Sequence, residues 1–133
     1  ARQKNGFIGR KQYPIGPVQW AVWGTASPMT VTTGKRILFE FQSGGWDDFG
    51  LNADTTGLDA GDTVEITVET PAGAVVATQT ITGATTAGDQ ATTSTASIPA
   101  LSPRLVVKAK GTYAVITSVD VNCQVFLRRL NSC

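Results

Sequence analysis

Histidine is absent from this chain of 133 residues. Without an imidazole the chain has no Ser-His-Asp or Cys-His catalytic unit, and no histidine can ligate zinc. No two glycines stand two positions apart, so the sequence contains no G-x-G-x-x-G phosphate-binding loop. These absences exclude most hydrolytic, zinc-dependent and nucleotide-binding chemistry. We therefore expect no enzymatic activity, no catalytic residue and no cofactor.

Cysteine is scarce, with only Cys123 and Cys133. Two cysteines do not make a disulfide scaffold. Cys123 lies in an alternating apolar run, which predicts a buried free thiol, and Cys133 is the last residue of the sequence. A bridge between the two, or an interchain bridge through Cys133, is the alternative. The redox compartment stays open on this basis.

Charged residues are also few, at 16%, and they nearly cancel to a net charge of +1. Their distribution is uneven. Residues 1–36 carry six Lys or Arg and no acid, residues 37–103 carry nine acids and no Lys or Arg, and residues 104–133 carry five basic residues and one acid. The small net charge argues against nucleic acid as a partner. The segregation favours oriented contacts between protein surfaces.

No long apolar run suggests a membrane span. The longest charge-free stretch, residues 12–34, contains three prolines and three glycines, which are incompatible with a spanning helix. The first residues also lack the apolar core of a secretory leader. We expect no membrane partner.

Residues 1–30 are predicted to form an extended basic and aromatic N-terminal arm. Gly6, Gly9, Pro14, Gly16 and Pro17 make a helix unlikely there, and a core strand is not expected before residue 18. Residues 31–133 are predicted to form a single sandwich domain.

The sandwich is predicted from the composition and from alternation of apolar residues. Nineteen threonines, together with valine and glycine, favour strands and turns over helices. Alternating runs and turn signals recur every eight to twelve residues or so, which is typical of an all-β, antiparallel, two-sheet jelly-roll-like sandwich. Residues 71–73 are predicted to form a hairpin turn, and residues 46–62, after Ser43-Gly44-Gly45 ends a strand, a loop. The expected strands are residues 37–41 (with Ile37, Phe39 and Phe41 on one face), 63–69, 74–82, 90–98, 104–110, 113–117 and 119–127.

Acidic residues gather in the predicted loop at Asp47, Asp48, Asp54, Asp59 and Asp62. Calcium takes six to eight oxygen ligands, but this spacing matches no calcium loop. Adjacent carboxylates such as Asp47 and Asp48 also do not face one another across a cleft, as glycoside hydrolysis requires. We expect solvated turns and no metal.

Aromatic side chains offer an alternative function. Trp20 and Trp46 are candidate sugar-stacking residues of a carbohydrate-binding module or host-surface adhesion domain. In an extended chain, however, Trp20 and Trp23 point to opposite sides because they are three positions apart.

Three segments carry a resemblance to a known group of proteins. They are LDAGDTVEI (residues 58–66), RLVVKA (104–109) and TSVDV (117–121). Their order resembles the jelly-roll sandwich of carbohydrate-binding modules and of the jelly-roll decoration, or cement, proteins of tailed-phage capsids. The basic arm ahead of the sandwich favours the capsid group.

The resemblance implies a structural virion protein of a bacteriophage, located on the outer capsid surface. Such a protein would bind the major capsid protein and copies of itself, as a homo-oligomer with a trimer as one candidate, and would stabilise neighbouring capsid subunits through its arm and sandwich surface. Basic residues of the arm would orient the contact and apolar residues would anchor it. The expected interface residues are Arg2, Lys4, Phe7, Arg10, Lys11, Tyr13, Trp20 and Trp23.

Overall fold

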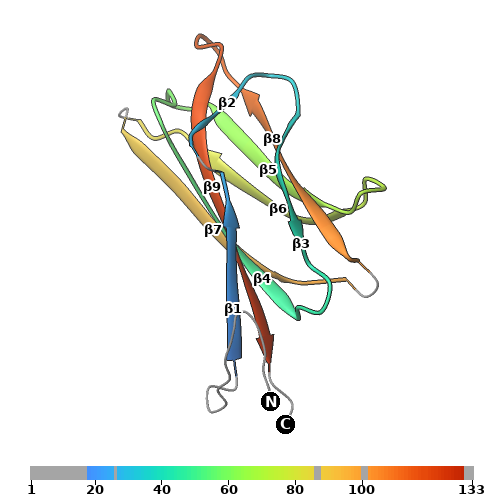
Figure 1. The fold of residues 1–133 in the computed structure, drawn as a ribbon. Coiled ribbons are helices and arrows are strands. Elements are labelled where there is room, and N and C mark those ends of the chain that lie inside the picture. Colours follow the sequence, from blue (N-terminus) through green and yellow to red (C-terminus); the bar gives the residue numbers. More distant parts are fainter. Residues whose placement is uncertain (1–17, 26, 86–87, 100–101, 131–133) are drawn as a thin grey trace.

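The computed structural model describes residues 18–25, 27–85, 88–99 and 102–130. These residues form two antiparallel sheets packed face to face (Figure 1). Sheet A has the order β1-β9-β4-β7, with β2 also paired to β9, and sheet B has the order β3-β8-β5-β6. The strands are β1 (Val18–Gly24), β2 (Met29–Val31), β3 (Arg36–Gln42), β4 (Asp48–Thr56), β5 (Thr63–Glu69), β6 (Val75–Thr82), β7 (Asp89–Ser97), β8 (Arg104–Thr112) and β9 (Val119–Leu130).

The core fills the space between the sheets because the central strands bury alternate side chains. Each fully buried Val, Leu, Ile or Phe side chain stabilises the fold by about 1.5–3 kcal/mol. The predicted all-β sandwich is therefore confirmed, with its apolar faces turned inward. The buried apolar side chains of β4, β5, β8 and β9 include Phe49, Leu51, Ala53, Val64, Ile66, Val68, Leu105, Val107, Ala109, Val121, Cys123, Val125 and Leu127.

The turn between β5 and β6 is the predicted hairpin. The Thr70 N–H donates to the Ala74 carbonyl at 2.9 Å, and the Gly73 N–H donates to the Thr70 carbonyl at 2.9 Å. Gly73 has a φ of 99°, a conformation that residues with a Cβ adopt only under strain. Strand β7, predicted as a strand at residues 90–98, lies at the edge of sheet A.

Residues 48–56 differ from the prediction, because they form β4 instead of a loop. Phe49, Leu51 and Ala53 are buried, and the residues between them face outward. Asp, Asn and Gly at the outward positions suggested turns, but these positions tolerate polar residues because they face solvent.

Two further elements were predicted wrongly. Ile37 does not share a face with Phe39 and Phe41, because the register shifts between Ile37 and Phe39 and leaves the Ile37 side chain 50% exposed. Residues 113–117 are a loop. The Tyr113 hydroxyl donates to the Val31 carbonyl at 2.7 Å, and the Ala114 N–H donates to the Asp62 carboxylate at 3.0 Å, so this segment is held by side-chain hydrogen bonds.

Part of the expected N-terminal arm belongs to the sandwich. Strands β1 and β2, at residues 18–24 and 29–31, both pair with β9. Residues 1–17 lie outside the described part of the chain. Within the described part, no helix is long and apolar enough to cross a membrane.

Candidate interaction surfaces

Strand β1 and the last residues of β9 project together from one end of the sandwich (Figure 1). Val18 pairs with Leu130 and Gly24 with Gln124, in an unbroken antiparallel register. Among the described strands, β1 pairs with β9 alone. Val22 is 57% exposed and Trp23 is 39% exposed. We call these two strand segments, residues 18–24 and 124–130, the β1–β9 tip.

Ionic and aromatic contacts join the β1–β9 tip to the rest of the sandwich. The Arg128 guanidinium donates to both carboxylate oxygens of Asp48, with Nη2 2.5 Å from Oδ2 and Nε 2.9 Å from Oδ1. This pair raises the pKa of Arg128. The guanidinium carbon of Arg129 lies 4.7 Å from the centre of the Trp46 ring. These contacts join β9 to the segment that leads into β4.

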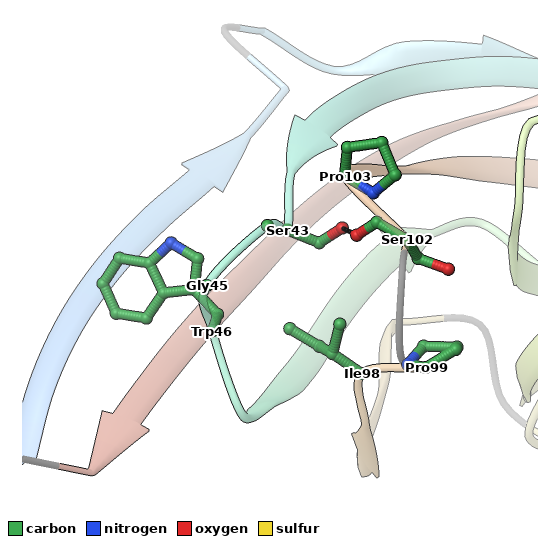
Figure 2. A pocket seen from close by; sticks show the side chains of 8 residues that line it. Ser43, Gly45, Trp46, Ile98, Pro99, Ser102 and Pro103 are labelled. Carbon is green, nitrogen blue, oxygen red and sulfur yellow. Dashed lines mark hydrogen bonds between the residues drawn. The ribbon is translucent and has the colours of Figure 1, made fainter. Parts of the chain in front are cut away.

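A cavity of about 500 Å³ opens beside Trp46. The Ser43 hydroxyl donates to the Ser102 carbonyl at 2.7 Å, and Figure 2 shows the two residues pointing toward one another. None of the lining residues is titratable, so the cavity suits an apolar or neutral group and has no acid or base for catalysis. The lining residues are Ser43, Gly44, Gly45, Trp46, Ile98, Pro99, Ser102 and Pro103.

The geometry around Trp46 bears on the sugar-stacking alternative. The indole is partly buried against the core, and Arg129 covers one face of its ring. A sugar on that face would have to displace the guanidinium. The side chain of Trp20 lies outside the described part of the structure, so a platform formed by Trp20 and Trp46 stays a prediction.

The acidic residues between positions 47 and 62 do not converge. Asp48 and Asp54 lie on β4, while the buried Asp62 carboxylate accepts hydrogen bonds from the backbone N–H groups of Asp59 and Ala114. Across the described residues, no group of three or more Asp, Glu or Cys side chains is placed to hold a metal. Asp62 stabilises the loops at its end of the sandwich.

An ionic cluster around the buried Glu69 carboxylate lies on the outer face of sheet B. The Glu69 carboxylate is 2.5 Å from the Lys35 ammonium and 3.1 Å from the Lys108 ammonium, and the Thr67 hydroxyl donates to it at 2.8 Å. Hydrogen bonds from Lys35 and then Thr67 lower the pKa of Glu69 from 4.5 to about 2, against the effect of burial. Glu69 is the last residue of the strand predicted at residues 63–69, and the sequence gives no signal that it is buried.

Cys123 is a free, buried cysteine on the inner face of β9, as predicted. Burial, with a smaller contribution from the charge of Asp54, raises the pKa of its thiol to about 12. The thiol is therefore protonated and unreactive at neutral pH. Cys133 lies outside the described residues, so its predicted role stays a prediction.

Most of the predicted interface also lies outside the described residues, namely Arg2, Lys4, Phe7, Arg10, Lys11 and Tyr13. Of the remaining two, Trp20 pairs with Arg128 in the β1–β9 ladder and Trp23 pairs with Val125. Sequence reasoning did not single out Val22, which is more exposed than Trp23. The uncharged, strand-favouring run at residues 18–23 was the signal in the sequence that could have indicated this exposed strand.

No protein-family model matches the chain, and no curated protein matches it. Among solved structures, a Bacillus endospore appendage protein, from a family described as disulfide-linked pili, is 14% identical, with a TM-score of 0.52, and the match covers 93% of this chain and 99% of that chain. VP2 of infectious bursal disease virus, in a subviral particle, is 10% identical, with a TM-score of 0.55, and the match covers 86% of this chain. The chain spans 33% of VP2. At these identities the comparisons show a shared fold, the β-sandwich of a pilus protein and a viral capsid protein.

Proposed function

We propose that this chain is a structural subunit that binds copies of itself within a larger protein assembly, and specifically a decoration protein on the outer surface of a phage capsid. The observation that carries the proposal is the shared fold: the match spans 99% of a pilus protein and 33% of a viral capsid protein. A sandwich of this size makes up almost the whole of that pilus protein, which supports the same kind of role for this chain. The capsid assignment within that class rests on the sequence resemblance and on the basic residues ahead of the sandwich.

Charge placement supports contacts between unlike surfaces. Residues 1–17 carry four basic residues and no acid, whereas residues 37–103 carry nine acids and no basic residue. A basic segment of one copy would meet the acidic body of a neighbouring copy or shell protein. Such pairing orients partners and accelerates their encounter more than it adds affinity.

Native mass spectrometry of the full chain and of a chain beginning at residue 18 tests the self-association. We expect the full chain to form oligomers and the shortened chain, which keeps β1 and the rest of the sandwich, to form them more slowly, while circular dichroism shows that the sandwich stays folded. A full chain that stays monomeric would contradict the self-association, and a shortened chain that assembles as fast as the full chain would show that residues 1–17 take no part in it.

The capsid assignment needs its own measurement. We expect the full chain to co-sediment with capsids purified without it, and the shortened chain to remain in the supernatant. The alternative, a carbohydrate-binding or host-surface adhesion domain, predicts binding on a broad glycan array that is lost in Trp46→Ala. If the chain bound glycans and did not bind capsids, the carbohydrate-binding alternative would replace the proposal of a decoration protein.

A further inference from the structure

One edge of β1 pairs with no other described strand, so its backbone groups have no ladder partner among the described residues. The Thr25 N–H donates to the Cys123 carbonyl at 3.0 Å, which makes Thr25 and Cys123 a hydrogen-bonded position of the ladder. Hydrogen-bonded and non-hydrogen-bonded pairs alternate along antiparallel strands. The backbone N–H and C=O groups of Trp23, Ala21 and Gln19 therefore also point toward β9. The backbone N–H and C=O groups of the four residues between them point away from β9. These residues are Val18, Trp20, Val22 and Gly24.

The opposite side of β9 supports this alternation. The Arg128 and Asp120 carbonyls accept hydrogen bonds from the Asp47 N–H and the Thr55 hydroxyl, at the β4 side. The backbone N–H and C=O groups of even-numbered residues of β9 therefore point toward β4, and those of odd-numbered residues point toward β1 and β2. The outward direction of the four β1 residues follows from two independent sets of contacts.

The other edges among the described strands are closed or protected. Strands β6 and β7 approach one another at one side of the sandwich, where the Gln79 amide donates to the Thr92 hydroxyl. On the β2 edge, the Arg36 guanidinium donates to the Thr30 carbonyl at 2.8 Å. Strand β3 carries a bulge and the charges of Arg36 and Glu40. Bulges, charges and covering contacts are the usual means by which sheet edges avoid pairing with other chains.

Within the part of the chain that the structure describes, strand β1 has none of these protections. Its seven residues, VQWAVWG, contain no charge and no proline, and its register is free of bulges. Two of its side chains, Val22 and Trp23, are exposed apolar groups. An uncharged, regular, exposed edge is a template for strand addition.

The edge is complementary to itself. If two β1 strands pair antiparallel about Ala21, Val18 lies opposite Gly24 of the second copy and Trp20 lies opposite its Val22. All four outward residues of each strand then meet an outward residue. Four hydrogen-bonded pairs with two bonds each give eight interchain hydrogen bonds across the seven-residue strands.

We infer that β1 is a self-association site, at which the β1 edge of a second copy adds antiparallel and extends sheet A across two molecules. This inference rests on the proposed assembly with copies of the chain. Residues 1–17 are poorer candidates for this edge, because Pro14 and Pro17 lack a backbone donor and three glycines disfavour a strand.

Val22→Pro tests the site, because it removes a backbone donor that faces away from β9 and leaves the β1–β9 ladder intact. Val22→Thr is the matched control, since it keeps the donor and a β-branched side chain. Sedimentation equilibrium of the full chain should show Val22→Thr associating like the unmodified protein. Val22→Pro should weaken association by roughly tenfold or more, because the symmetric pairing loses two hydrogen bonds per dimer.

Hydrogen exchange on the unmodified full chain gives a second measurement that needs no variant. The amides of Val18, Trp20, Val22 and Gly24 should gain protection as protein concentration rises, while that of Ala21 is protected throughout. Association that survives Val22→Pro would overturn the β1 site and leave the assembly function standing. Protection independent of concentration and lost on removing residues 1–17 would instead place the chain's own arm on the edge. A protein that stays monomeric would overturn both proposals.

Discussion

At the scale of single residues, Glu69 makes the stability of the fold depend on pH in the acid range. Its side chain is 4% exposed and accepts hydrogen bonds from Thr67 and Lys108 beside the Lys35 ammonium. Because its pKa is about 2 in the folded chain and near 4.5 ordinarily, the carboxylate stabilises the fold fully above about pH 4.5. That contribution is lost as the pH falls toward 2.

Glu69→Gln should lower the free energy of unfolding at pH 7 by about 1–2 kcal/mol, because it leaves two partly exposed lysines without their carboxylate. The loss of stability between about pH 4.5 and pH 2 should be much smaller in Glu69→Gln than in the unmodified protein. Thermal unfolding followed by circular dichroism across this pH range measures both effects.

Glu65→Gln is the matched control, since Glu65 lies on the same strand but is exposed. Glu65→Gln should lose as much stability between about pH 4.5 and pH 2 as the unmodified protein does. If Glu69→Gln lost as much stability between about pH 4.5 and pH 2 as the unmodified protein does, the acid sensitivity would belong to other carboxylates. No local pattern in the sequence predicts this cluster, because Lys35, Glu69 and Lys108 meet only after three strands have paired.

At the scale of elements, the segment after β8 is held in place by one tyrosine. The Tyr113 ring lies over Gly111, where a Cβ would overlap it, and its hydroxyl donates to the Val31 carbonyl at 2.7 Å. Gly111 also donates its N–H to the Thr32 carbonyl at 2.9 Å. These contacts fasten the loop between β8 and β9 to the chain that leaves β2.

Tyr113→Phe should cost about 1 kcal/mol of unfolding free energy, the typical value of one hydrogen bond. Gly111→Ala should cost at least as much, because its methyl group displaces the ring. The double variant should be little worse than Gly111→Ala, since the hydroxyl of a displaced ring has no bond to lose. Urea unfolding measures all three.

Gly88→Ala serves as the control for Gly111→Ala, because nothing lies within 4 Å of the position that its Cβ would take. Its effect should stay below about 0.5 kcal/mol. Additive losses in the double variant would mean that Gly111 and Tyr113 act separately.

The elements also show what sequence patterns can predict. Strands with clean alternation, such as residues 63–69 and 119–127, were predicted because buried and exposed residues alternate with a period of two. Strand β4 was missed because its outward positions carry Asp, Asn and Gly, which are common in turns. The Ile37–Phe39 bulge was missed because a register shift has no signature in one strand and depends on the partner strand.

The candidate surfaces were less predictable than the fold. The sequence indicated an interface near Trp20 and Trp23, and Trp23 does lie on an exposed edge strand. Which backbone groups of β1 face outward follows from pairing with β9, a strand about a hundred residues later in the chain, and no local pattern contains that information.

At the scale of the whole molecule, the separation of charge should govern how fast assembly proceeds. A variant with Arg2, Lys4, Arg10 and Lys11 all replaced by Gln should associate more slowly than the unmodified protein. Its association rate should also depend less on salt, because screening acts on charges that the variant lacks. Stopped-flow light scattering at low and high ionic strength measures both.

Lys110→Gln is the control, since Lys110 is an exposed cation on the sandwich. It should leave the rate and its salt dependence close to those of the unmodified protein. The melting temperature should be unaffected in both variants. A four-residue variant with unchanged salt dependence would show that the basic segment takes no part in the encounter.

The adjacent ends of β1 and β9 have a mechanical consequence. The chain enters β1 at Val18 and leaves β9 at Leu130, and these two residues pair with one another. Force that pulls these two points apart loads the ladder one hydrogen bond at a time, so β1 peels from β9 at low load. Tension carried along paired β1 strands from one copy to the next instead loads all the interchain hydrogen bonds together in shear. The same strand is therefore weak when the two ends of its own chain are pulled apart and strong as a link between molecules.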